Sequence, residues 1–148
     1  MSNETFVYVT YIAATPEKTW NALLQGELTR QYWGGHENVS ASDWKKGSTW
    51  QHVASDGNRT VKHVGEVLEC VPNQRLVLSW AQPEDAADRS RHTRVALDIE
   101  TVGDMVRLTV THDQLYPAMQ RRITYGWPLV LCSLKSFLES GRPLKIFS

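Results

Sequence analysis

The sequence predicts an α+β fold, in which an antiparallel sheet of six or seven strands packs on a long helix at the end of the chain. Three observations favour this class: a succession of strand-like segments in the middle of the chain, alternation of apolar and polar residues within them, and an amphipathic segment after them. Strands followed by a helix are typical of a sheet with one face covered by that helix. We therefore expect a single domain over residues 1–148.

The chain opens with one predicted strand and two short predicted helices. Residues 6–13 are rich in Val, Tyr and Ile and indicate a strand. Thr15 can cap a helix that Pro16 begins and Gly26 ends, and a second helix runs from Glu27 to the Gly34-Gly35 pair. The inward face of the strand stays open between two sets, Phe6, Tyr8 and Ile12 or Val7, Val9 and Tyr11.

Five further strands are predicted before the closing helix. They cover residues 48–53, 61–70, 75–80, 93–101 and 105–112, and turn residues separate nearly all of them. Residues 82–92 are polar and have no apolar period, which predicts a mobile loop. The element order is therefore strand, two small helices, five antiparallel strands and a long helix.

The closing helix is predicted over residues 127–140. Pro128 suits a first-turn position, where a missing N–H costs nothing, and Gly141 suits the end. A helix of this length is marginal alone in water, so its stability must come from packing. One wide apolar face provides that packing surface: Trp127, Val130, Leu131, Leu134, Phe137 and Leu138.

Two histidines are predicted to face each other across a hairpin. If the loop joining the second and third strands has an even number of residues, His52 pairs with residue 61 or 63. His52 and His63 then share a sheet face with Trp50 and Val67, and the charged Lys62 on the other face makes the histidine face the inner one. His112 of the last strand can join them.

Three roles are open for these histidines. They can hydrogen-bond within the fold, they can contact a ligand, or they can bind a metal. The five histidines lack the close pairs of local zinc or iron sites, so no metal is expected. The tryptophans divide between core packing and ligand contact, with Trp20 assigned to the core and Trp44 to the surface near a cavity mouth.

Composition excludes several classes of function. Sixteen Lys and Arg balance sixteen Asp and Glu with no basic run, which argues against nucleic acid as a partner. No apolar stretch approaches 18 residues, and Met1-Ser2-Asn3-Glu4 does not resemble a signal peptide, so we expect a cytoplasmic protein without a membrane contact. Cys70 and Cys132 are expected to be buried reduced thiols.

No catalytic signature stands out in the sequence. There is no Gly-x-Ser-x-Gly elbow, no phosphate-binding glycine loop and no dinucleotide fingerprint, so no cofactor is expected. Glu69 and Glu100 interrupt strand segments but suit solvated or salt-bridged positions. Whether the protein is an enzyme stays open at this point.

Segments along nearly the whole chain resemble the SRPBCC or START-like superfamily, which has the helix-grip fold of the birch pollen allergen. Within it, the chain is most similar to the family related to the activator of heat-shock protein 90 ATPase. The resemblance implies a curved antiparallel sheet around the C-terminal helix, with a cavity that often holds a hydrophobic small molecule. The matching segments are residues 12–20, 28–33, 65–72, 75–80, 107–112 and 126–127.

The expected function is a small intracellular protein that binds a hydrophobic or aromatic molecule between sheet and helix. The alternatives are a cyclase-, aromatase- or hydrolase-like enzyme that uses cavity histidines, and a co-chaperone-type interaction domain. The eukaryotic co-chaperone has an additional N-terminal domain for which this chain has no room, so chaperone contact is the weaker expectation. A monomer and a homodimer are both compatible. The expected ligand-binding residues are Trp33, Trp50, His52, His63, Val67, Trp80, Leu97, Leu108, Val110, His112, Trp127, Val130, Leu131 and Leu134.

Overall fold

A computed structural model describes residues 4–54 and 56–146 of the chain. The first three residues, on which the expectation of no leader peptide partly depends, lie outside this range. The described residues form a seven-stranded antiparallel sheet in the order β1-β7-β6-β5-β4-β3-β2. Its strands are β1 (Glu4–Ile12), β2 (Glu37–Ser40), β3 (Thr49–Val53), β4 (Val61–Val71), β5 (Arg75–Trp80), β6 (Thr93–Val102) and β7 (Met105–Leu115).

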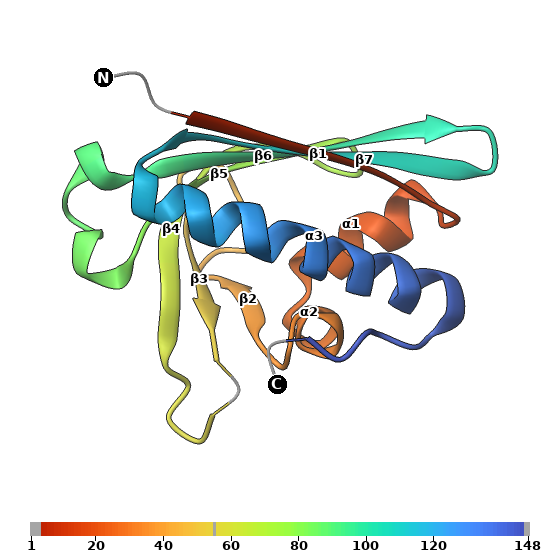
Figure 1. The fold of residues 1–148 in the computed structure, drawn as a ribbon, viewed down its shortest axis with the longest axis horizontal. Coiled ribbons are helices and arrows are strands. Elements are labelled where there is room, and N and C mark those ends of the chain that lie inside the picture. Colours follow the sequence, from red (N-terminus) through yellow and green to blue (C-terminus); the bar gives the residue numbers. More distant parts are fainter. Residues whose placement is uncertain (1–3, 55, 147–148) are drawn as a thin grey trace.

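Within the described residues, three α-helices accompany the sheet: α1 (Pro16–Leu24), α2 (Gly26–Tyr32) and the long α3 (Pro117–Ser140). In Figure 1 the strands β1, β6 and β7 lie along the top, β3 and β4 run downward, and α3 crosses the hollow side of this bent sheet. The predicted α+β class and helix-grip arrangement are confirmed. The short strand β2 at the sheet edge was not predicted from the sequence.

Helix α3 begins ten residues earlier than predicted. Pro117, not Pro128, occupies the first turn, and Pro128 lies inside the helix. The prediction was wrong because Pro128 matches a helix start, whereas the apolar stripe continues upstream of it. Met119 and Ile123 are 1% and 7% exposed, and they extend the buried face that Trp127 continues.

Strand β1 directs one set of side chains inward, which decides between the two alternatives. Val7, Val9 and Tyr11 are exposed, whereas Ile12 is fully buried and its alternate neighbours pack on the core. The exposed residues form an apolar row on the outer side of an edge strand. Within the described residues, no helix has the length and apolar character needed to cross a membrane.

Three local expectations need correction. Trp44 is buried rather than superficial, because its indole N–H donates to the Leu24 carbonyl at 3.1 Å and its ring stacks on Trp50. Cys132 is exposed and Cys70 is only half-buried, although both are free thiols. Residues 82–92 are not a plain loop, because they contain two short 3₁₀ helices, η1 (Pro83–Asp85) and η2 (Arg89–Arg91).

A glycine permits the close approach of β4 to β5. Gly65 pairs with Trp50 of β3, and a Cβ on it would lie 1.8 Å from the Ser79 carbonyl oxygen. That oxygen accepts a hydrogen bond from the Trp50 indole N–H at 2.9 Å. Only a residue without a side chain fits this position.

Candidate ligand-binding cavity

A cavity of about 330 Å³, called the aromatic cavity below, lies between the sheet and the first half of α3. Its volume is at the lower end of the range of small-molecule sites, which is roughly 300–1,000 Å³. The sheet supplies histidines and a tryptophan, and α3 supplies apolar side chains. The lining residues are Trp33, His36, His52, Lys62, His63, Trp80, Met119, Arg122, Ile123, Tyr125, Gly126, Trp127 and Val130.

Six of the residues expected to contact a ligand are brought together in this cavity: Trp33, His52, His63, Trp80, Trp127 and Val130. The other eight point inward but are covered by neighbouring side chains, and they form the core beneath the cavity: Trp50, Val67, Leu97, Leu108, Val110, His112, Leu131 and Leu134. Trp50 and Leu97 border only an enclosed gap of about 10 Å³. Alternation along a strand identifies the inner face but not how deep each position lies.

Five residues of α3 that also line the cavity were missed because the helix was predicted to begin at Trp127: Met119, Arg122, Ile123, Tyr125 and Gly126. Continued apolar spacing at Met119 and Ile123 was the available signal. Lys62 was assigned to the outer face by alternation, yet it lines the cavity. Its side chain is long and exposed, as expected at a rim. His36 follows the Gly34-Gly35 turn, and no pattern in the sequence indicated its place.

His52 is held by a polar network that connects β2, α2 and β3. The predicted pairing is confirmed, because His52 lies opposite His63. Asn38 Oδ1 lies 2.6 Å from His52 Nδ1, and Asn38 Nδ2 donates to the Leu23 carbonyl, so the histidine nitrogen is the donor. The proton therefore sits on Nδ1. This leaves Nε2 as an acceptor, and no protein hydrogen bond within the described part of the chain reaches it.

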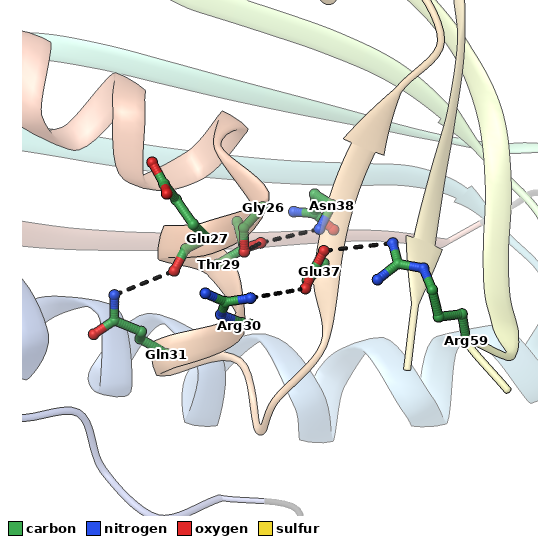
Figure 2. A network of polar contacts seen from close by, with 8 residues as sticks. All are labelled: Gly26, Glu27, Thr29, Arg30, Gln31, Glu37, Asn38 and Arg59. Carbon is green, nitrogen blue, oxygen red and sulfur yellow. Dashed lines mark hydrogen bonds and ion pairs between the residues drawn. The ribbon is translucent and has the colours of Figure 1, made fainter. Parts of the chain in front are cut away.

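Figure 2 shows how Asn38 is fixed in turn. Its backbone N–H donates to Thr29 Oγ1 at 3.0 Å, and that hydroxyl donates to the Gly26 carbonyl at 3.1 Å. Next to it, the Glu37 carboxylate forms ion pairs with Arg30 at 3.4 Å and with Arg59 at 3.5 Å. Thr29 is fully buried, so the network anchors the short edge strand to α2 and, through Asn38, sets the orientation of the His52 ring.

His112 has a purely structural set of partners. The Trp127 indole N–H donates to His112 Nδ1 at 3.1 Å, so the histidine proton must be on Nε2. Nε2 lies 2.7 Å from Thr93 Oγ1, and that hydroxyl donates to the Trp80 carbonyl at 2.8 Å. Each polar atom in this series of hydrogen bonds has a partner. His112 therefore connects β6 and β7 to α3 and has no capacity left for a ligand.

Two buried polar atoms of the cavity lining have no partner in the described residues. They are the Trp80 indole N–H and His63 Nδ1. Trp80 is only 4% exposed, and the comparable indole N–H groups of Trp44, Trp50 and Trp127 each have an acceptor. A buried N–H without an acceptor costs roughly 1–3 kcal/mol. Such a group in a cavity wall is suited to a ligand oxygen.

Aromatic rings form the wall around these atoms. The Trp127 ring contacts Trp33 edge-on at 5.5 Å and Trp80 at 5.8 Å between centroids. His63 lies 4.7 Å from Trp80 and 5.7 Å from His52. These separations are those of favourable aromatic pairs. The wall is therefore rigid and apolar, with polar atoms only at a few fixed points.

Burial keeps the cavity histidines neutral at pH 7. Loss of solvation lowers the pKa of His52 to about 2, with further lowering by His63 and His36. Loss of solvation also lowers the pKa of His63 to about 4, and the positive charges of Arg122 and then the weaker effects of His36 and Lys62 add to it. These rings can therefore accept a hydrogen bond or a proton but carry no charge of their own.

A second hollow, of about 760 Å³, lies between α1, α2 and β2. It is larger and more open than the aromatic cavity, and its lining is as polar as it is apolar. None of the unpartnered buried polar atoms lies in it, so size alone does not make it the better candidate. Among the described residues, no group of three His, Cys, Asp or Glu side chains is arranged to hold a metal ion.

Comparison with solved structures shows the same fold at low sequence identity. CalU16 from Micromonospora echinospora has a TM-score of 0.72 at 20% identity, over 94% of this chain and 78% of that one. The Aha1 dimer from Colwellia psychrerythraea has 0.72 at 24%, over 93% and 98%. PFC0360w, an HSP90 activator from Plasmodium falciparum, has 0.73 at 17%, over 90% and 95%. At these identities the likeness shows the fold alone.

Among curated proteins, none matches this chain. The family model described as activator of Hsp90 ATPase homolog 1-like protein matches residues 13–139, from the end of β1 to the last turn of α3. That span includes every residue that lines the aromatic cavity. The chain therefore belongs to the family of activator of Hsp90 ATPase homolog 1-like proteins.

Proposed function

We propose that the protein binds a small aromatic or largely apolar molecule in the cavity between the sheet and α3. The observation that carries the proposal is the buried Trp80 indole N–H, which lines the cavity without an acceptor in the described residues. A ligand oxygen would satisfy it. Enclosing about 300 Å² of apolar ligand area at about 25 cal/mol per Å² contributes about 7 kcal/mol before the ordering costs of binding.

A thermal-shift screen tests the proposal. A panel of aromatic acids, amides, flavonoids and polyketides should contain compounds that raise the melting temperature, because a ligand at 100 times its Kd stabilises the folded state by about 2.7 kcal/mol. Isothermal titration then gives the Kd of each active compound. No shift from any member of a broad panel would contradict ligand binding.

Two matched variants locate the binding site. Trp80→Phe and Trp50→Phe remove the same volume and one indole N–H each, but only Trp80 lines the cavity. Trp80→Phe should weaken ligands with an oxygen acceptor by about 3- to 10-fold, the value of one hydrogen bond. Trp50→Phe should leave the Kd unchanged and cost more stability, because it leaves the buried Ser79 carbonyl without its indole donor. The same loss of affinity in both variants would argue against this cavity.

A cyclase- or hydrolase-like enzyme is the second candidate, because His63 Nδ1 has no partner and His52 Nε2 is a free acceptor. A pKa of about 4 makes His63 a weak general base at pH 7, where catalysis favours a pKa near the working pH. Binding is therefore better supported than proton transfer. Mass spectrometry of each bound compound after incubation distinguishes the two, since a carrier returns its ligand unchanged.

A further inference from the structure

We infer that the natural ligand is an aromatic acid, whose anionic group lies at the cavity mouth between Lys62 of β4 and Arg122 of α3. The inference rests on the proposed binding function and specifies its ligand class. Lys62 and Arg122 of the lining are cationic, and no Asp or Glu among the described residues lines the cavity. This excess is local, because the whole chain has a formal net charge of zero.

Neither of these two cations forms an ion pair within the described residues, a property that they share with Lys18, Lys45, Lys46, Arg121, Arg142 and Lys145. Within residues 4–54 and 56–146, no salt bridge involves Lys62 or Arg122, although most arginines of the sheet are paired. On β4 and β5, for example, Glu66 pairs with Arg89 at 2.9 Å and Arg75 with Asp98 at 2.6 Å. The paired cations belong to the outer surface, while the two at the cavity mouth remain available for an anion.

Both charges act on the same part of the cavity. Arg122 and Lys62 each lower the pKa of His63, and Lys62 also lowers that of His36. Because the histidines are neutral at pH 7, Lys62 and Arg122 supply the positive charge of the lining. Lys62 belongs to β4 and Arg122 to α3, so the positive charge of the lining comes from both the sheet and the helix.

Within the described residues, no neighbouring carboxylate forms a salt bridge with Lys62 or Arg122. Glu84 and Asp85 border an adjacent hollow shared with Arg122, and Asp85 lies 3.8 Å from Arg91. Asp56, whose charge opposes the lowering of the His36 pKa, accepts hydrogen bonds from the Thr60 backbone N–H at 3.0 Å and hydroxyl at 2.7 Å. None of these three carboxylates lines the aromatic cavity.

The size of the cavity limits the acid. Its volume of about 330 Å³ corresponds to roughly eleven waters at about 30 Å³ each in the liquid. One fused pair of aromatic rings with a carboxylate is of that order. The rings would pack on Trp33 and Trp127, and an oxygen of the ligand would accept from Trp80.

The test compares acids with their uncharged amides. Benzoate, cinnamate and 2-naphthoate are each titrated calorimetrically into the full chain beside benzamide, cinnamamide and 2-naphthamide, at pH 7.5 in low salt. We expect the best acid to bind at least tenfold more tightly than its amide. Raising the salt to 0.5 M should weaken the acid and leave the amide unchanged, because salt screens exposed charges.

Three substitutions complete the test. Lys62→Gln and Arg122→Gln should each reduce acid affinity at least threefold with no change for the amide, while Arg121→Gln, next to Arg122 but outside the lining, should change neither. Equal binding of acids and amides, or equal effects of Arg121→Gln and Arg122→Gln, would overturn the inference and leave the proposed function standing. Absence of binding by all six compounds would count against both.

Discussion

Gly65 lies where β4 passes so close to β5 that a Cβ would meet the Ser79 carbonyl oxygen at 1.8 Å and the Trp50 indole nitrogen at 2.6 Å. Both atoms are fixed, the first by the backbone and the second by its hydrogen bond to that same carbonyl. A side chain at position 65 could therefore be accommodated only if β4 and β5 moved apart. This makes the position a sensitive probe of the packing beneath the cavity.

Gly65→Ala should lower the free energy of unfolding by about 1–3 kcal/mol or more, the usual cost of overpacking a rigid core. Gly57→Ala is the matched control, because nothing lies within 4 Å of a Cβ there. Urea unfolding of both variants measures the difference. A Gly65→Ala protein as stable as the Gly57→Ala protein would mean that the two strands are not held this closely.

The two buried histidines with assigned partners should hold opposite tautomers. Asn38 requires the His52 proton on Nδ1, and Trp127 requires the His112 proton on Nε2. Two-bond ¹⁵N–¹H correlation spectra at pH 7 distinguish the tautomers by their ring nitrogen shifts. The same tautomer in both rings would contradict one of the two networks.

At the scale of elements, α3 is fastened to the end of β1 by a pair of side chains. Glu139 accepts from the Ala13 backbone N–H and from Lys135 Nζ, both at 2.7 Å, and Lys135 also donates to the Tyr11 carbonyl. The Lys135 ammonium, with Ala13, keeps the pKa of Glu139 below its usual value. The last turns of the helix are thus connected to the first strand at a point distant from the cavity lining.

Glu139→Gln should cost about 1 kcal/mol of stability at pH 7, less than the roughly 1.5–3 kcal/mol of a typical hydrogen bond to a charged group, since this carboxylate is partly exposed. The difference should shrink as the pH falls below the ordinary glutamate pKa of about 4.3 toward the lower folded-state pKa, because protonation of the wild-type carboxyl removes the same charge. A double-mutant cycle with Lys135→Met measures the coupling. Purely additive effects would show that the pair does not act as a unit.

Sequence reasoning predicted the strands well because their inner faces alternate. It offered residue 61 or 63 as the partner of His52 on the assumption of an even-numbered loop, whereas seven residues separate β3 from β4 and a register shift between His52 and Val53 brings His63 opposite His52. It misplaced the start of α3, because the local signal of Pro128 was given more weight than the continued stripe at Ile123. That error hid Arg122 and four other lining residues of α3, Met119, Ile123, Tyr125 and Gly126. The sequence also does not indicate how far each inward side chain lies from the cavity, since Trp50 and Trp80 follow the same alternation but only Trp80 lines the cavity.

At the scale of the whole molecule, three buried histidines link stability to pH. Burial lowers the pKa of His52, His63 and His112 to about 2, 4 and 3, whereas in the unfolded chain each titrates near its ordinary value of about 6.5. Below pH 6.5 the unfolded chain therefore binds protons that the folded protein cannot. The stability that these neutral histidines contribute is fully present above this pH, and it is lost as the pH falls toward their folded-state pKa values.

The free energy of unfolding should decrease by several kcal/mol between pH 7 and pH 5, because each proton bound only by the unfolded chain contributes about 1.4 kcal/mol per pH unit. Guanidinium unfolding in steps of half a pH unit measures the slope. A flat profile over this interval would mean that these rings are protonated in the folded state, in conflict with their burial.

Pro128 divides α3 into two parts with different contacts. Having no N–H, proline cannot donate to the carbonyl four residues earlier, so the backbone ladder is interrupted just after Trp127. Upstream of it α3 lines the aromatic cavity, and Val130 is the one lining residue after the proline among the described residues; the last turns contact β1 through Lys135 and Glu139. Substitutions at exposed lining positions of the upstream part, such as Arg122 and Tyr125, can therefore change the cavity while the contacts of the last turns with β1 stay intact.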